Sequence, residues 1–224
     1  MLALRDVIRR SLWAKGLTQE QLARVEREMF ERTIQAGGFL RHRGDHPEYW
    51  FGVIEGLVKM SIDSSTGRAI SFTTIAVGGW FGEGTLLKKE LHKSDFVALR
   101  TSRVAFMPQR TFAWLLDDSN AFNQFLLHQL NERLGQFVGF VASGRMDEIS
   151  VRIAHSLASL FNPLLYPDMG LDVPISQAEI ALLAGASRQR TNQVLHMLEQ
   201  RGLLRVGYGG VTVVDLDGLR KFAA

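Results

Sequence analysis

A glycine-rich turn that carries a single acid is the first stretch of the chain suited to binding chemistry. In the run FGEGTLL, Gly82 and Gly84 flank Glu83, and ten residues after the acid the chain offers Lys93 and then Ser94. Glycine lets backbone N–H groups approach a ligand closely, and a lysine ammonium supplies a point charge for an anion. The stretch is therefore a candidate cradle for a small molecule.

A second candidate binding surface lies near the C-terminal end, in the run SRQRTNQVLHMLEQ. Thr191, Val194, Leu195 and Leu198 follow the i, i+3, i+4, i+7 spacing of one buried helix face. The outward positions and their flanks carry Arg188, Gln189, Arg190, Asn192, Gln193, His196 and Gln200. Arginine suits the major-groove edge of guanine, and glutamine and asparagine suit that of adenine. This helix is therefore a candidate reader of DNA bases.

The residues around this helix predict a winged helix-turn-helix. Ser176 is placed to cap a preceding helix, Gly185 to make the sharp turn, and Ser187 to cap the polar-faced helix. The apolar runs on either side of GYGG indicate a two-stranded wing, with Arg201 and Arg205 placed to meet phosphates.

The elements that carry the glycine-rich turn have a different character. From residue 32 to 107, β-branched and aromatic runs alternate with the turn signals GG, RGD, SSTG and VGG, which predicts a small antiparallel barrel or jelly roll. A leading helix is expected from Thr18 to Glu31, opened by a capping box of Thr18 and Gln21.

A long helix is predicted from Ala121 to Gly144, between the strand-rich region and the helix-turn-helix. It carries an apolar stripe at alternating three- and four-residue spacing: Leu127, Leu130, Leu134, Phe137 and Val141. Such a stripe is typical of a two-helix seam, although a helix lying on its own domain is the alternative. A further helix is expected over residues 150–161, with a domain boundary near residues 144–146.

Composition narrows the class of protein. The 224 residues contain no cysteine, which excludes disulfides and thiolate metal sites. No signal peptide and no apolar run long enough to span a bilayer is found, so we expect a cytoplasmic protein without membrane attachment. The net charge of +3 does not by itself identify nucleic acid as a partner.

The order of these parts resembles the CRP/FNR superfamily of bacterial transcription regulators over nearly the whole chain. The marks are IQAGGFLRHRGDHPEYWFGVIEGLVKMS, FGEGTLL and ISQAEIALLAGASRQRTNQVLHMLEQRGLL. The resemblance implies an α+β chain: an effector-sensing, cyclic-nucleotide-binding-type β-roll over residues 1–118, a dimerisation helix over 119–145, and a winged helix-turn-helix domain over 146–224.

The resemblance also implies partners. The stripe of the long helix would form a homodimer seam, and each subunit would place Arg188, Gln189, Asn192 and Gln193 in the major groove of a palindromic operator, with Ser187 and Arg205 toward phosphates. Many relatives carry an acid where Gln189 stands and an arginine where Gln193 stands, so the usual half-site preference is not carried over. RNA polymerase is the expected partner of an activator.

For the pocket, the resemblance implies that the turn around Gly82, Glu83 and Gly84, with Ser94, would hold a phosphate and a ribose hydroxyl. Lys93 stands where cyclic-AMP-binding relatives have an arginine, and lysine lacks the bidentate fork. The base site would lie at Phe137 and Val138, which offer no hydrogen bonds, and Arg133 completes the set. We therefore expect a small effector other than cyclic AMP, and no cofactor is assigned.

Two alternatives stay open. The first is a dimer that binds DNA without any effector. The second is a cupin-like metalloenzyme with His42, His46, Glu48 and His92 as ligands, but the H-x-H pair of cupins is absent, and His128 in the long helix is expected to be exposed rather than a haem ligand. No nucleophile elbow, P-loop or dinucleotide motif is found, so we predict neither an enzyme nor a metal site.

Overall fold

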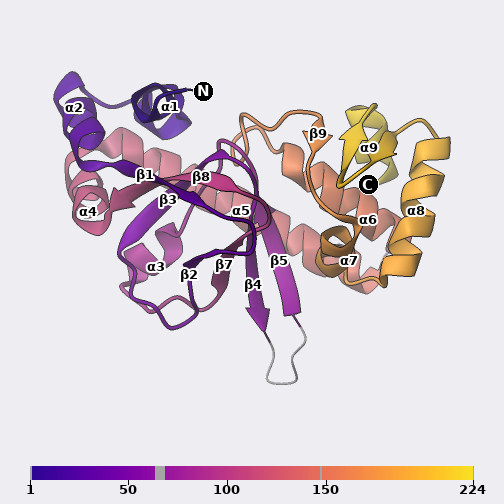
Figure 1. The fold of residues 1–224 in the computed structure, drawn as a ribbon. Helices are drawn as coiled ribbons and strands as arrows, with labels where there is room; N and C mark the ends of the chain where they lie inside the picture. Colours follow the sequence, from indigo (N-terminus) through magenta and orange to yellow (C-terminus); the bar gives the residue numbers. More distant parts are fainter. Residues whose placement is uncertain (1, 64–68, 147, 224) are drawn as a thin grey trace.

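The computed structural model describes residues 2–63, 69–146 and 148–223 (Figure 1). The whole of the expected SSTG turn, and Asp147 beside the expected domain boundary, lie outside these residues. The chain starts with α1 (Leu4–Arg10), which the sequence analysis did not predict, a short 3-10 helix η1 (Leu12–Ala14), and α2 (Gln19–Glu28). The capping box is confirmed, because the Thr18 side chain accepts from the Gln21 N–H and the Gln21 side chain accepts from the Thr18 N–H. The helix ends three residues earlier than expected, since Phe30 already begins a strand.

Eight strands form the predicted roll, as two antiparallel sheets in the orders β1-β8-β3-β6 and β2-β7-β4-β5. Their bounds are β1 Phe30–Ile34, β2 Phe39–Arg41, β3 Tyr49–Glu55, β4 Val58–Asp63, β5 Ala69–Ile75, β6 Trp80–Phe81, β7 Asp95–Ala98 and β8 Ser102–Pro108. The short helix α3 (Glu83–Lys88) follows β6. The α+β fold class is thus confirmed.

Strand β3 is buried on both faces, which explains its continuous apolar sequence. Phe51 and Val53 point into the core between the two sheets, whereas Trp50 and Ile54 point into a second core on the outer face. There Trp50 packs on Trp13, with ring centroids 5.5 Å apart. This second core holds the N-terminal helices, α4 (Gln109–Asp118) and the first turns of the next helix against the roll.

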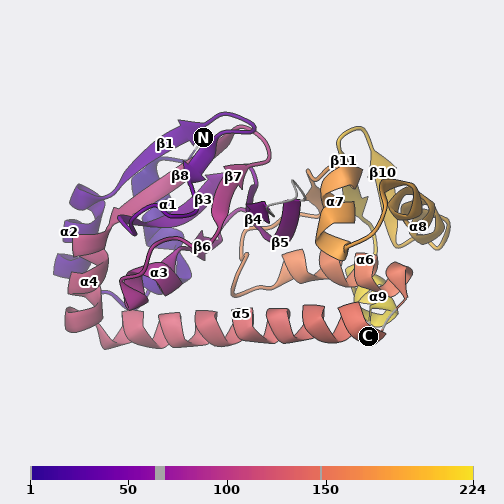
Figure 2. The ribbon, with the colours of Figure 1, turned by 90° about the horizontal axis from the view of Figure 1, so that it is seen from below.

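The long helix α5 (Asn120–Met146) slightly exceeds its expected span and runs along both halves of the molecule (Figure 2). Its first turns are anchored by Phe122 and Leu126, which are buried in the outer core. Gly139 allows α6 to come close, because a Cβ at this position would lie 3.1 Å from His155 Nε2. Helix α5 therefore physically connects the roll with the C-terminal domain.

The C-terminal domain contains α6 (Ile149–Ala158), η2 (Ser159–Phe161), α7 (Gln177–Ala184), α8 (Arg188–Gln200) and α9 (Leu216–Phe222). The expected wing is present as β10 (Leu204–Gly207) and β11 (Gly210–Val213), paired antiparallel. Two elements were not predicted: α9, and β9 (Asp172–Val173), which pairs with β11 and lies within a segment expected to be a connection. Buried residues of this domain join the same core as those of the roll, so the two halves are packed together.

Candidate functional site: a DNA-reading helix and a roll pocket

Helix α8 is built as its sequence predicts. Ser187 caps it by accepting a hydrogen bond from the Arg190 N–H at 3.2 Å, and Gly185 makes the turn from α7 in the left-handed conformation at φ 60°. Thr191, Val194, Leu195 and Leu198 are all buried. The helix is therefore fixed in one rotation about its axis, with Arg188, Gln189 and Gln193 exposed.

The outward face of α8 presents exposed polar side chains. Arg188, Gln189 and Gln193 are exposed, and Arg190 donates to the Gln193 Oε1 at 3.2 Å. Asn192 is only half exposed and donates to the Gln177 side chain at 3.0 Å, so its amide is already engaged with α7.

The wing is tied to α8 by one strong contact. The backbone N–H of Val206 donates to Glu199 Oε1 at 2.8 Å, and this hydrogen bond lowers the pKa of Glu199. On the wing, Arg205 is exposed, whereas the guanidinium of Arg201 lies over the Phe222 ring, 5.0 Å from its centroid. The first strand of the wing is thus held against α8.

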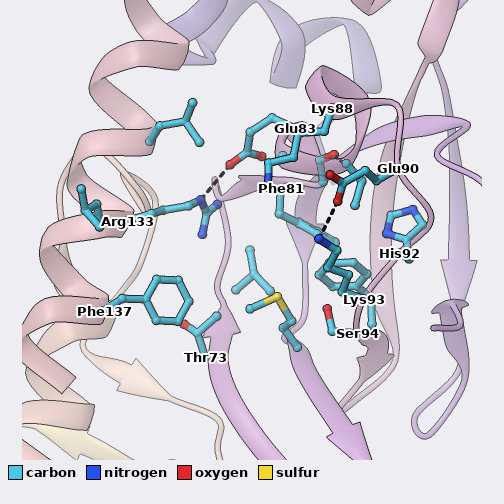
Figure 3. Close-up of a pocket in the computed structure, with 18 residues that line it drawn as sticks. Thr73, Phe81, Glu83, Lys88, Glu90, His92, Lys93, Ser94, Arg133 and Phe137 are labelled. Carbon is cyan, nitrogen blue, oxygen red and sulfur yellow. Dashed lines mark hydrogen bonds and ion pairs between the residues drawn. The ribbon is translucent and has the colours of Figure 1, made fainter. Parts of the chain in front are cut away.

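A cavity of about 390 Å³, which we call the roll pocket, lies between the roll, α3 and α5 (Figure 3). Of the residues expected in the pocket, those that line it are Gly82, Glu83, Gly84, Lys93, Ser94, Arg133 and Phe137. Val138 does not line it and is 61% exposed, because one residue along a helix turns the side chain by about 100° away from Phe137. Gly82, at φ 96°, needs the conformational freedom of glycine.

Glu83 is the most buried charge of the roll pocket, with 3% exposure. Its Oε1 accepts from Arg133 Nε at 3.0 Å and its Oε2 from the Trp50 indole N–H at 3.2 Å. Arg133 also donates to the carbonyl of Trp80. Burial by itself lowers the pKa of Arg133, but its interactions with Glu83 and Tyr166 together outweigh burial, and the pKa lies above its usual value. The pair links α5 to the start of α3.

The other cation expected in the pocket is engaged within the chain. Lys93 Nζ lies 2.6 Å from Glu90 Oε2, and this hydrogen bond lowers the pKa of Glu90. Lys88 and Glu90 also line the pocket and were not predicted to do so, and His92, which lines it too, was predicted only as a candidate metal ligand. These residues could have been predicted from their position in the sequence. They lie between the glycine-rich turn and Lys93, and both ends of this segment were expected in the pocket.

The candidate metal ligands do not come together. His42 stacks on Phe39, Glu48 pairs with Arg41, and His92 lies in the roll pocket. Over residues 2–63, 69–146 and 148–223, no three His, Cys, Asp or Glu side chains are grouped so that they could hold a metal ion. His128 is exposed on α5.

The stripe of α5 is largely uncovered in the single chain. Leu127 and Leu134 are each 61% exposed, Val141 is 55% exposed, and Leu130 is half-buried because it lines the roll pocket. Phe137 belongs to both the stripe and the pocket.

A further contact joins the roll to the helix-turn-helix. Lys59 Nζ on β4 lies 3.2 Å from Glu179 Oε1 on α7, and both side chains are mostly buried. A second cavity of about 290 Å³ beside this junction is lined by Phe72, Leu182 and again Phe137. Phe137 therefore separates the roll pocket from the domain junction.

Comparison with known families agrees with this geometry. Residues 31–119 match the family model described as "Cyclic nucleotide-binding domain", and residues 151–222 match the one described as "Crp-like helix-turn-helix domain". The chain belongs to the CRP/FNR family of transcription regulators. As a CRP/FNR regulator it is a DNA-binding protein with an effector-binding type of domain at its N-terminal side.

Individual CRP/FNR relatives support the same assignment. The chain is 27% identical over 179 residues to the cAMP-activated global transcriptional regulator CRP of Haemophilus influenzae, covering 78% of this chain and 79% of that protein. It is 27% identical over 176 residues to the transcriptional regulator SdrP of Thermus thermophilus, covering 77% and 83%. Among solved structures, FixK2 from Bradyrhizobium japonicum superposes with a TM-score of 0.74 at 16% identity, covering 88% and 98%. No described helix of this CRP/FNR chain is both long and apolar enough to cross a bilayer.

Proposed function

We propose that the protein is a homodimeric transcription regulator that binds a palindromic operator and is controlled by a small effector in the roll pocket. The observation that carries the proposal is α8, a capped helix with one buried face and an exposed face of Arg188, Gln189 and Gln193. Its wing is held against it by Glu199, so helix and wing would meet the major groove and the adjacent phosphates together. Asn192 would need to leave Gln177 to reach a base.

The exposed stripe of α5 supports the homodimer. Four apolar side chains of the stripe region are more than half exposed: Leu127, Leu134, Val138 and Val141. Contiguous apolar surface of this kind marks an interface, and helices with this spacing pack side by side. A two-fold axis along α5 would give each dimer two copies of α8 for two half-sites.

Two features of the roll pocket support an effector other than cyclic AMP. Lys93 replaces the expected arginine and is already bonded to Glu90, and Phe137 offers no hydrogen bond to a base. A buried purine amine left unpaired there would cost about 1–3 kcal/mol. We propose that the effector acts through β4 and β5, because Met60 and Thr73 on these strands line the pocket while Lys59 contacts α7.

A second candidate is a regulator that binds DNA without an effector, and one observation favours it. Glu83 and Arg133 neutralise each other, as do Lys93 and Glu90, so among the described residues these four pocket charges are satisfied within the chain and only Lys88 is left without an ion pair. In either case we propose a cytoplasmic protein, and RNA polymerase as a partner if it activates transcription.

Selection of operator sequences from a random DNA library tests the proposed function. The full chain should enrich a palindrome whose half-sites lie about one helical turn apart. Arg188→Ala and Gln193→Ala should each relax preference at one base pair per half-site and cost about 1–3 kcal/mol. The matched control is Arg205→Ala, which should weaken all sequences alike. The proposal is wrong if wild type enriches no palindrome, or if the α8 variants select the same bases as wild type.

Adding cell extract or candidate metabolites to the same assay separates the two candidates. An effector-controlled regulator should change its operator affinity with at least one addition. A regulator without an effector should bind equally under all of them.

A further inference from the structure

The roll pocket contains a buried imidazole that lacks a partner. His92 is 2% exposed, and neither of its ring nitrogens has a hydrogen bond within the part of the chain that the structure describes. Its ring lies edge-on to Phe96, with centroids 5.7 Å apart. Buried polar side-chain atoms nearly always have a hydrogen-bond partner. A ligand or a water molecule in the pocket would supply the partner that the described residues do not.

The two carboxylates of the roll pocket, Glu83 and Glu90, are already paired with Arg133 and Lys93, so the groups left for a ligand near His92 are mainly donors. Figure 3 shows His92, Lys93 and Ser94 on one side of the pocket, opposite Arg133 and Phe137. Lys88 also lines the pocket, and over the described residues it has no ion pair. Burial, together with the charge of Arg41, lowers the pKa of His92, so the ring is neutral near pH 7 and still carries one N–H donor. Such a set of donors matches a ligand with acceptor oxygens.

Apart from Arg133, which is paired with Glu83, the α5 side of the pocket is apolar. Leu130, Leu134 and Phe137 from α5 line the cavity together with Met60 and Ile75 from the roll. The volume of about 390 Å³ lies in the lower part of the range of small-molecule sites, about 300–1,000 Å³. A ligand that fills it must therefore combine a compact apolar body with a polar head on the side of His92.

We propose that the roll pocket binds an amphipathic organic anion, a carboxylate or phosphate on an aromatic or branched aliphatic body, and that His92 is a specificity-determining residue for its head. The head would accept hydrogen bonds from His92 and Ser94, and it would replace Glu90 as the ion-pair partner of Lys93. The body would lie against Phe137. The inference rests on the effector site of the proposed function but not on DNA binding.

The test compares two probes of nearly the same shape and different charge. Titration calorimetry on the full chain would measure 1-naphthylacetate against the neutral 1-naphthylacetamide, with 1-naphthyl phosphate to distinguish a phosphate from a carboxylate head. We expect at least one anion to bind about tenfold more tightly than the amide, which corresponds to about 1.4 kcal/mol. Lys93→Gln should remove most of this preference, because it removes the positive charge. His92→Phe should weaken binding of the anion more than binding of the amide and so reduce the preference.

Two further variants keep the test interpretable. His92→Gln retains a donor and should restore part of the preference, whereas Lys89→Gln, an exposed lysine that does not line the pocket, should bind like wild type. Circular dichroism would verify that each variant is folded.

Three results would overturn the inference: no probe binds, acid and amide bind equally, or His92→Phe keeps the full preference, which would assign the partner of His92 to water. Operator selection without any probe is independent of all three. If the protein selects a palindromic operator but none of the probes binds with the expected preference, the effector inference is wrong and the proposed function stands. If it fails while the probes discriminate, the proposed function is lost instead.

Discussion

Replacing Arg133 by methionine should strongly destabilise the roll. The side chains of Arg133 and Glu83 are 14% and 4% exposed, so the change leaves a buried carboxylate with only the Trp50 indole as a donor. Removing one partner of a buried ion pair costs about 3–5 kcal/mol. Because Trp50 still donates, we expect a loss near the lower end, about 3 kcal/mol in the free energy of unfolding.

The pairwise origin of this loss can be isolated by a double-mutant cycle. In the double variant Arg133→Met/Glu83→Gln no charge remains buried and the glutamine oxygen can still accept from Trp50, so its stability should lie within about 1 kcal/mol of wild type. Urea unfolding followed by tryptophan fluorescence is suited to this measurement. The Trp50 indole donates a hydrogen bond to Glu83, the Trp80 carbonyl accepts one from Arg133, and the centroids of the two indole rings lie 4.6 Å apart. Protein concentration must be held constant across variants.

An exposed ion pair provides the control. The side chain of Arg9 is 50% exposed in its ion pair with Glu26, so Arg9→Met should lower the free energy of unfolding far less than Arg133→Met does. The reasoning would be refuted if Arg133→Met cost no more than this control, or if the double variant lost the sum of the two single losses.

Three further predictions follow from the other contacts. Glu179→Gln, which breaks the ion pair with Lys59 across the domain junction, should speed hydrogen exchange in α7 but not in the roll; unchanged exchange in α7 would contradict it. Leu134→Glu, at an exposed position of the stripe, should give a folded monomer in sedimentation and abolish operator binding, whereas a stable dimer would exclude this seam. His92 has a lowered pKa because of burial and the charge of Arg41, so the unfolded chain takes up a proton first as the pH falls below about 6.5. Wild type should therefore lose more thermal stability between pH 7 and pH 5 than His92→Phe, and parallel curves would contradict this.

Local features were predictable from sequence because they depend on neighbouring residues. The caps at Thr18, Ser176 and Ser187, the left-handed turn at Gly185 and the buried face of α8 all follow from residue type and a 3.6-residue period. The alternation of strands and turns likewise predicted the roll. The elements that were missed, α1, β9 and α9, are two to seven residues long, too short for a periodic signal, and tertiary packing stabilises them.

Residue types and their spacing were enough to identify candidate ligand-binding residues near the glycine-rich turn and the polar face of α8. How the pocket residues are used depends on packing: Glu83 meets Arg133, 50 residues away, and the buried ring of His92 has no hydrogen-bond partner among the described residues. The tertiary structure also placed Val138 outside the pocket, and Phe137 between the pocket and the domain junction. The physical reason is that ion pairing, desolvation and cavity shape arise between segments far apart in the chain, where periodicity and spacing carry no information.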